Sequence, residues 1–364
     1  MSADEQSGPK SKRGCASSLG LMLAVPAAGL SFAWLSYGLS WWSAALAVGL
    51  WLVVLGLLVP PASRSFGHRV LAAGGLLILG PWLVRTVLVR GSDPTRLTTL
   101  PADSGPRLLS RLYPEPDGTL TAAGLLAMQG GLKDPESSRF AEILRQAYAR
   151  SEPSTTLLPT PAIATYLGLQ SPTAFDTIVM RPPERRVAAD GALVFLHGYA
   201  GNFYVYCWEI AQAAAAANLV TLCPSVGPSG AWWEPSGERT LEAVLDYAHD
   251  IGMNRVYLAG LSNGAAGASV LSLKYQERLA AVVLISGVRA EQPPPLPVLV
   301  IQGASDQMMQ ASSARRYAAR SQRATYRELP GGHLIFLSEY AKVRPIIAQF
   351  LSQLEQRGTL LPGR

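Results

Sequence analysis

A serine lies at the centre of a short glycine-framed motif that suits a nucleophile. Residues 260–264 read GLSNG, which puts Ser262 in the middle of a G-x-S-x-G pattern. The motif follows the apolar run 255–259 and precedes the helix-compatible run 265–270. On such a strand-to-helix turn the serine backbone is strained, and the residues two positions away must be small to avoid clashes. We predict that Ser262 is a nucleophile at a helix N-terminus, which stabilises negative charge. The alternative is a turn serine that only caps the helix.

Two further side chains could activate this serine, because a hydroxyl is a poor nucleophile until a base accepts its proton. His333 follows two glycines and the strand-like run Thr325 to Leu329, so its loop can bring an imidazole to the edge of a sheet. Asp306 follows the apolar run Pro297 to Ile301, where a carboxylate can orient and stabilise an imidazolium. We predict His333 as base and Asp306 as its partner. The alternatives are a surface-loop histidine and a helix N-cap for the stretch that begins near Gln310.

A second loop is predicted to bind the oxyanion of a tetrahedral intermediate. Residues 197–201 read HGYAG and directly follow the apolar run 192–196. The backbone amide of Tyr199, together with that of Asn263 after the serine, is suited to this role. His197 is expected to hold the loop rather than to act as the base.

The elements that would position these residues alternate between strand and helix from about Ile178 onward. Short apolar runs bounded by Gly, Pro or Ser alternate with helix-like stretches, a pattern that predicts a mostly parallel sheet covered on both faces. The expected strands are 192–196, 219–223, 255–259, 281–285 and 297–301, and the expected helices are 204–217, 238–251, 264–275 and 310–320.

The chain order of Ser262, Asp306 and His333, together with the His197-Gly198 loop, resembles the α/β-hydrolase superfamily of esterase-like and lipase-like serine hydrolases. The resemblance covers roughly residues 175–355. It implies an α/β-hydrolase fold and acyl transfer to water through an acyl-enzyme on Ser262, without a cofactor. Because this fold hosts many chemistries, it does not name the substrate. A carboxylic-ester hydrolase is the main hypothesis. A thioesterase, a peptidase and a catalytically silent membrane-bound binding module remain alternatives.

The segment between the expected strand 281–285 and the expected strand 297–301, which precedes Asp306, is too short for the large helical cap that many lipase-like members carry. Only about a dozen residues separate Ser286 from Pro297. The pocket is therefore expected to be open or covered by the connector at 91–174. Trp232 and Trp233 follow the run 219–223, so they emerge near the catalytic edge and could line the pocket. Ordinary aromatic packing under a loop is the alternative.

That connector, at 91–174, is rich in Pro, Ser, Thr and Arg and contains two helical patterns. The stretch Thr121 to Gln129 is followed by Gly130 as an expected C-cap. A second helix is expected to begin near Asp134, and it would place residues 140, 143, 144 and 147 on one face. No chemistry is indicated here, so the catalytic domain is expected to comprise residues 175–364.

The N-terminal residues predict a multi-pass membrane protein. After a polar segment at 1–18, the runs Leu19 to Tyr37 and Trp42 to Val59 contain no charged residue, whereas Val70 to Val89 is interrupted by Arg85. About 20 apolar residues cross a bilayer. A cleaved signal peptide would explain the first run but not the second. Residues 19–90 are therefore predicted to contain two or three transmembrane helices.

The orientation of these spans follows from the flanking basic residues. Lys10, Lys12 and Arg13 favour a cytoplasmic N-terminus, and the basic residues at 64–69 favour the same side. Three spans would then place the catalytic domain outside the cytoplasm. Arg90 and Arg96 favour instead a third run that lies on the inner surface. We expect three spans and an external domain.

Composition narrows the class of partner to a membrane and a small-molecule or lipid ester. The net charge is +6, but the basic residues are scattered and form no tract that could follow a nucleic acid. The four histidines are far apart and no CxxC pair occurs, so no metal site is expected. Cys207 and Cys223 could pair in an oxidising compartment. The preferred interpretation is two unpaired, buried cysteines. Protein partners are not indicated.

Overall fold

The computed structural model describes residues 11–60, 63–89, 95–128, 136–151, 157–183 and 189–359. The chain forms two compact units, Met1–Leu88 and Val89–Arg364. The expected helix end at Gly130, the expected cap at Asp134 and the basic residues Lys10 and Arg90 lie outside the described residues.

The first unit consists of three helices, which are α1 (Ser11–Tyr37), α2 (Trp41–Leu58) and α3 (Arg64–Leu88). Each is long and apolar enough to cross a membrane, with mean hydropathies of 1.7, 2.0 and 1.7 over the candidate spans. The third helix begins six residues before the apolar run expected at 70–89 and continues through Pro81.

Glycines allow α2 and α3 to pack closely. A Cβ atom on Gly74 would lie 2.8 Å from the carbonyl oxygen of Gly49, and one on Gly56 would lie 2.6 Å from Leu71. Small residues at such contacts let two membrane helices approach through van der Waals packing. Arg85, the charge that interrupts the third run, is buried, and its guanidinium carbon lies 5.3 Å from the centre of the Trp42 ring. The two helices thus form a specific pair.

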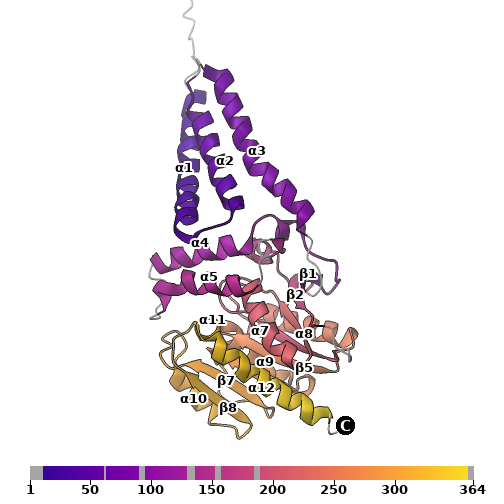
Figure 1. Cartoon of the computed structure of the whole chain (residues 1–364). Coiled ribbons are helices and arrows are strands. Elements are labelled where there is room, and N and C mark those ends of the chain that lie inside the picture. The colour runs from indigo at the N-terminus through magenta and orange to yellow at the C-terminus, as the bar shows by residue number, and fades with distance from the viewer. Residues whose placement is uncertain are drawn as a thin grey trace, which may run out of the picture. The chain divides into compact units, whose positions relative to one another are not determined.

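The second unit is built on one eight-stranded sheet with helices on both faces (Figure 1). Its strand order is β1-β2-β4-β3-β5-β6-β7-β8. The pairs β1–β2 and β2–β4 are antiparallel, and all other neighbouring strands are parallel. The predicted mostly parallel sheet is therefore confirmed. The strands are β1 (Thr95–Leu100), β2 (Phe175–Met180), β3 (Gly191–Leu196), β4 (Leu219–Pro224), β5 (Arg255–Leu261), β6 (Ala281–Ile285), β7 (Val298–Gly303) and β8 (Ala324–Leu329).

The helices divide between the two faces of this sheet. One core cluster joins α8, α9 and α10 to alternate strand residues such as Val194 and Leu196, whereas α7 and α12 pack together on the other face. Because side chains alternate across a strand, Phe195 points to that second face and meets Phe336. The helical segments are η2 (Leu108–Arg111), α4 (Glu115–Met128), η3 (Ser137–Arg139), α5 (Phe140–Arg150), α6 (Ala162–Tyr166), α7 (Tyr204–Ala216), α8 (Pro235–Asp250), α9 (Asn263–Lys274), η5 (Gln276–Arg278), α10 (Ala311–Ala318), α11 (Ile335–Ser338) and α12 (Tyr340–Thr359).

The sheet includes a strand that lies earlier in the chain than any strand expected from the sequence. β1 lies within the segment that was expected to be a helical connector, and it pairs with β2 over six residues. The sequence pattern predicted no strand at Thr95–Leu100. Three threonines and an arginine interrupt the apolar pattern of this strand, and pairing at the edge of the sheet stabilises it.

The two cysteines of the second unit form a disulfide. Cys207 of α7 and Cys223 of β4 have Cα atoms 6.1 Å apart, and their sulfurs are bonded. The preferred interpretation of two unpaired cysteines is wrong, because α7 packs against β4 and brings the two side chains together.

Candidate active site

Ser262 stands on a strained turn between β5 and α9. Its φ and ψ angles are 54° and −119°, in the left-handed half of backbone space, where non-glycine residues are uncommon. The flanking glycines are required by sterics, as the sequence predicted. A Cβ atom on Gly260 would lie 2.3 Å from the carbonyl oxygen of Gly264, and one on Gly264 would lie 1.9 Å from that of Leu196. The turn thus lifts the serine hydroxyl to the carboxyl edge of the sheet.

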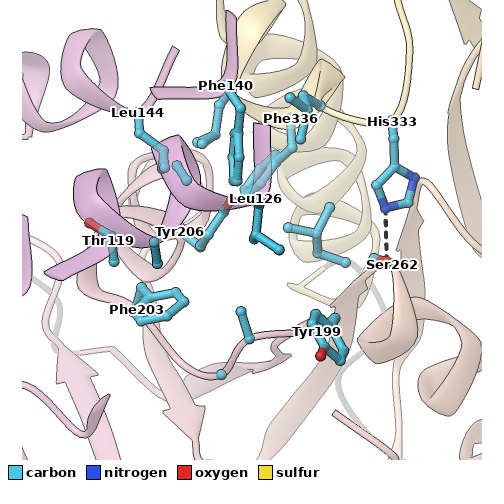
Figure 2. A pocket seen from close by; sticks show the side chains of 18 of the residues that line it. Thr119, Leu126, Phe140, Leu144, Tyr199, Phe203, Tyr206, Ser262, His333 and Phe336 are labelled. Atoms are coloured by element: carbon cyan, nitrogen blue, oxygen red, sulfur yellow. Dashed lines mark hydrogen bonds between the residues drawn. The ribbon is translucent and has the colours of Figure 1, made fainter. Parts of the chain in front are cut away.

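His333 and Asp306 lie next to this serine. The Nε2 atom of His333 is 2.9 Å from Ser262 Oγ, as the dashed line in Figure 2 marks, and its Nδ1 atom is 2.9 Å from Asp306 Oδ2. All three residues are less than 10% exposed. With a proton on Nδ1, the imidazole donates a hydrogen bond to the carboxylate, and Nε2 is then the ring nitrogen that can accept the serine proton.

Asp306 is held from both sides by groups other than the histidine. Its Oδ1 atom accepts the amide protons of Met308 and Met309, at 2.9 and 2.8 Å. Its Oδ2 atom accepts a hydrogen bond of 2.7 Å from the side-chain amide of Gln302. The carboxylate therefore orders a turn, but it does not cap α10, which begins at Ala311 after Gln310.

Gln302 was missed by sequence reasoning. Its signal was a polar residue near the end of an otherwise apolar strand, and its side chain is fully buried in β7. The amide also donates to the carbonyl of Met309, so it fixes the turn that carries Asp306.

The arrangement of strands and loops identifies the fold. The turn of Ser262 follows β5, Asp306 follows β7 and His333 follows β8, on a sheet whose single reversed strand is β2. The second unit has an α/β-hydrolase fold.

Comparisons with known proteins assign no activity to this chain. No protein-family model matches the chain, and no curated protein does. Among solved structures, Est1E from Butyrivibrio proteoclasticus is 12% identical with a TM-score of 0.44, and 50% of this chain and 94% of that chain are covered. The esterase of Pyrobaculum calidifontis is 17% identical with a TM-score of 0.41, covering 51% and 82%. XC6422 from Xanthomonas campestris, described as an α/β serine hydrolase without a lid, is 17% identical with a TM-score of 0.40, covering 54% and 93%.

The loop at 197–201 lies directly against Ser262. A Cβ atom on Gly198 would lie 3.1 Å from both Ser262 Cβ and the carbonyl oxygen of Leu261. Among the described residues, the amides of Tyr199 and Asn263 donate no backbone hydrogen bond. The amide of Ala200, by contrast, donates to the carbonyl of Pro228. Neither the Tyr199 amide nor the Asn263 amide is thus used by another backbone group of the described chain.

His197 has a structural position, as expected. Its Nε2 atom accepts the amide proton of Val226 at 3.1 Å, so Nδ1 donates to the carbonyl of Gly198 at 2.7 Å. Burial lowers the pKa of His197 to about 4, which keeps the ring neutral near pH 7. The ring holds two loops together and does not contact Ser262.

Neither tryptophan lines the pocket, so this prediction is corrected. Trp232 is fully buried in the core, and its ring N–H donates to the carbonyl of His197 at 2.9 Å. Trp233 lies under the guanidinium of Arg289, 4.5 Å from ring centre to carbon. The alternative of ordinary aromatic packing describes Trp232.

The pocket beside Ser262 is formed instead by segments far apart in the sequence. It has an empty volume of about 920 Å³, which includes its open side. Ser262 and His333 line one part of it, while α4 and α5 supply the opposite wall, as Leu126, Phe140 and Leu144 show in Figure 2. In the described part of the chain, no group of three or more His, Cys, Asp or Glu residues could hold a metal ion.

Proposed function

We propose that this chain is a membrane-anchored serine hydrolase that cleaves carboxylic esters through an acyl-enzyme on Ser262. The observation that carries the proposal is the hydrogen-bonded series from Ser262 through His333 to Asp306, with 2.9 Å at each step. The strained turn and the apolar pocket beside the serine support it. Such a series is the arrangement that turns a weakly nucleophilic hydroxyl into an attacking group.

In the proposed mechanism, the proton of Ser262 passes to His333 Nε2 as the serine oxygen bonds to the ester carbonyl carbon. The tetrahedral oxyanion accepts hydrogen bonds from the amides of Tyr199 and Asn263. Asp306 stabilises the imidazolium of His333, which then gives its proton to the departing alcohol as the carbon–oxygen bond breaks. Water, deprotonated by His333, hydrolyses the resulting acyl-enzyme and regenerates the serine.

Labelling with a fluorophosphonate probe tests the nucleophile. We expect covalent labelling of the detergent-solubilised full chain, loss of labelling and of esterase activity in Ser262→Ala, and an unchanged melting temperature, since alanine fits the same turn. Ser269→Ala, a buried serine on the following helix, is the control and should retain labelling. Wild-type turnover by Ser262→Ala would contradict the proposal.

The rival functions make different predictions for the same preparation. Paired model esters, thioesters and peptides distinguish an esterase from a thioesterase or peptidase, because the leaving groups differ while the acyl group is held constant. A catalytically silent binding module would neither label nor turn over any of them.

We propose that α1 to α3 all span the membrane and that the catalytic unit lies outside the cytoplasm. The three apolar helices support this number of spans, and the Cys207–Cys223 disulfide fits an oxidising compartment. Arg96 had favoured the opposite topology. Its guanidinium donates hydrogen bonds to Asp103 and Tyr247, at 3.1 and 2.9 Å, so its charge is paired within the second unit. Alkaline phosphatase and a cytoplasm-only reporter fused after Arg364 test the orientation; activity of the cytoplasmic reporter alone would refute it.

A further inference from the structure

The chemistry of the pocket beside Ser262 identifies a class of substrate. Among the described residues that line it, none is Asp, Glu, Lys or Arg, and most are aliphatic or aromatic. A charged or strongly hydrated group would lose its water here without gaining a partner. The apolar members include Leu126, Phe140, Leu144, Phe203, Met308 and Phe336.

The few polar side chains of the wall do not change this character. The hydroxyl of Thr119 donates within its own helix, to the carbonyl of Glu115 at 3.0 Å, and Figure 2 shows its oxygen turned away from Ser262. Tyr166 donates to the carbonyl of Ala200 at 2.9 Å. The pKa of Tyr206 is raised well above its ordinary value by burial and then by the nearby charge of Glu115, so this ring stays neutral.

The pocket continues from the serine toward an aromatic and aliphatic end. Tyr206 stacks on Phe336 with ring centres 6.3 Å apart, and Phe203 lies 6.5 Å from Tyr206. Leu144, which lines the pocket from α5, is almost fully buried. In Figure 2, Phe203 and Tyr206 lie across the cavity from Ser262, with Leu126 drawn between them.

We infer that the substrate is an ester with an apolar chain next to the scissile bond, and that α4 and α5 select this chain through Leu126, Phe140 and Leu144. The inference rests on the proposed esterase function and names its substrate class. Each methylene transferred from water to such a wall strengthens binding about fourfold. A chain that reaches the aromatic end gains this binding energy with each of its methylenes, whereas an acetyl group has no methylene and gains almost none.

The test measures kcat/KM of the detergent-solubilised full chain in two series. The acyl series is p-nitrophenyl acetate, butyrate, hexanoate and octanoate, and the alcohol series is the acetates of ethanol, butanol, hexanol and octanol. We expect kcat/KM to rise about tenfold or more along one series, which identifies the side of the ester that carries the chain. A flat profile in both series would overturn the inference but leave the esterase proposal intact, because acetate hydrolysis and its loss in Ser262→Ala report on that proposal alone.

Adjacent leucines on α4 provide a matched pair of variants. Leu126 lines the pocket, whereas Leu125 is 48% exposed and does not. Leu126→Trp should cut kcat/KM for the longest ester about tenfold more than kcat/KM for acetate, corresponding to two fewer buried methylenes. Leu125→Trp should leave both unchanged. Equal loss for acetate and the longest ester in Leu126→Trp, with an unchanged melting temperature, would also overturn the assignment of this wall.

Discussion

The buried carboxylate of Glu115 joins α4 to the start of α7, and its replacement tests this contact. Glu115 opens α4 and is only 4% exposed. Its oxygens accept hydrogen bonds from Thr160 and Tyr148, at 2.7 and 2.9 Å, and from the backbone amides of Tyr204 and Val205 at the start of α7. Burial, the dominant effect, raises the pKa of Glu115 from 4.5 to about 7 despite these donors.

The sign of the resulting pH dependence follows from proton binding. Between pH 4.5 and about 7 the folded chain holds a proton on Glu115 that the unfolded chain has lost. The raised pKa therefore contributes stability that is fully present below pH 4.5 and is lost as the pH rises through about 7. A tenfold change in proton affinity is worth about 1.4 kcal/mol, so the whole contribution is about 3 kcal/mol.

The assay compares Glu115→Gln with wild type. Glutamine is neutral at every pH, and its amide can donate to the Thr160 hydroxyl, whose own proton rotates away. We expect the melting temperature of wild type minus that of the variant to fall by about 5 to 10 °C between pH 5 and 8 for detergent-solubilised full chain. Glu142→Gln, an exposed carboxylate on α5, is the control, for which the difference should stay nearly constant.

One outcome would refute this reasoning about Glu115. A constant difference across the range would mean that the carboxyl does not titrate there, as expected if the four donors outweigh burial and keep its pKa at or below 4.5.

Further predictions concern the candidate triad, the disulfide and the membrane helices. Asp306→Asn and His333→Ala should each lower kcat by about 10⁴, and the double variant by little more, since such residues act as a unit; multiplicative losses would contradict this. Replacing Cys207 and Cys223 together by alanine should lower the free energy of unfolding by about 3 kcal/mol, given their separation of 16 residues, and reductant should then no longer change the melting temperature. Gly74→Leu should destabilise the α2–α3 pair by about 1–3 kcal/mol, seen as a lower yield of monodisperse protein, whereas Gly75→Leu, at an open position, should not.

Local patterns in the sequence determined the parts of this protein that depend on neighbours along the chain. The strand-to-helix turn at Ser262 could be predicted because its strain is relieved only by small residues two positions away, and both glycines meet backbone atoms in the structure. Buried parallel strands are apolar throughout, so five strands from β3 to β7 were predicted to within two residues at each end. The catalytic roles of Ser262, Asp306 and His333 remain predictions.

Only the tertiary structure decided the features that depend on distant segments meeting. β1 carries polar residues because it is an edge strand, and its pairing with β2 is not visible in its own pattern. The disulfide depends on the packing of α7 against β4, and the core position of Trp232 on the path of its loop. The pocket wall comes from α4 and α5, whose contact with the serine's surroundings is set by folding of the whole unit. A single sequence encodes local strain and periodicity directly, but it encodes proximity only through the final packing.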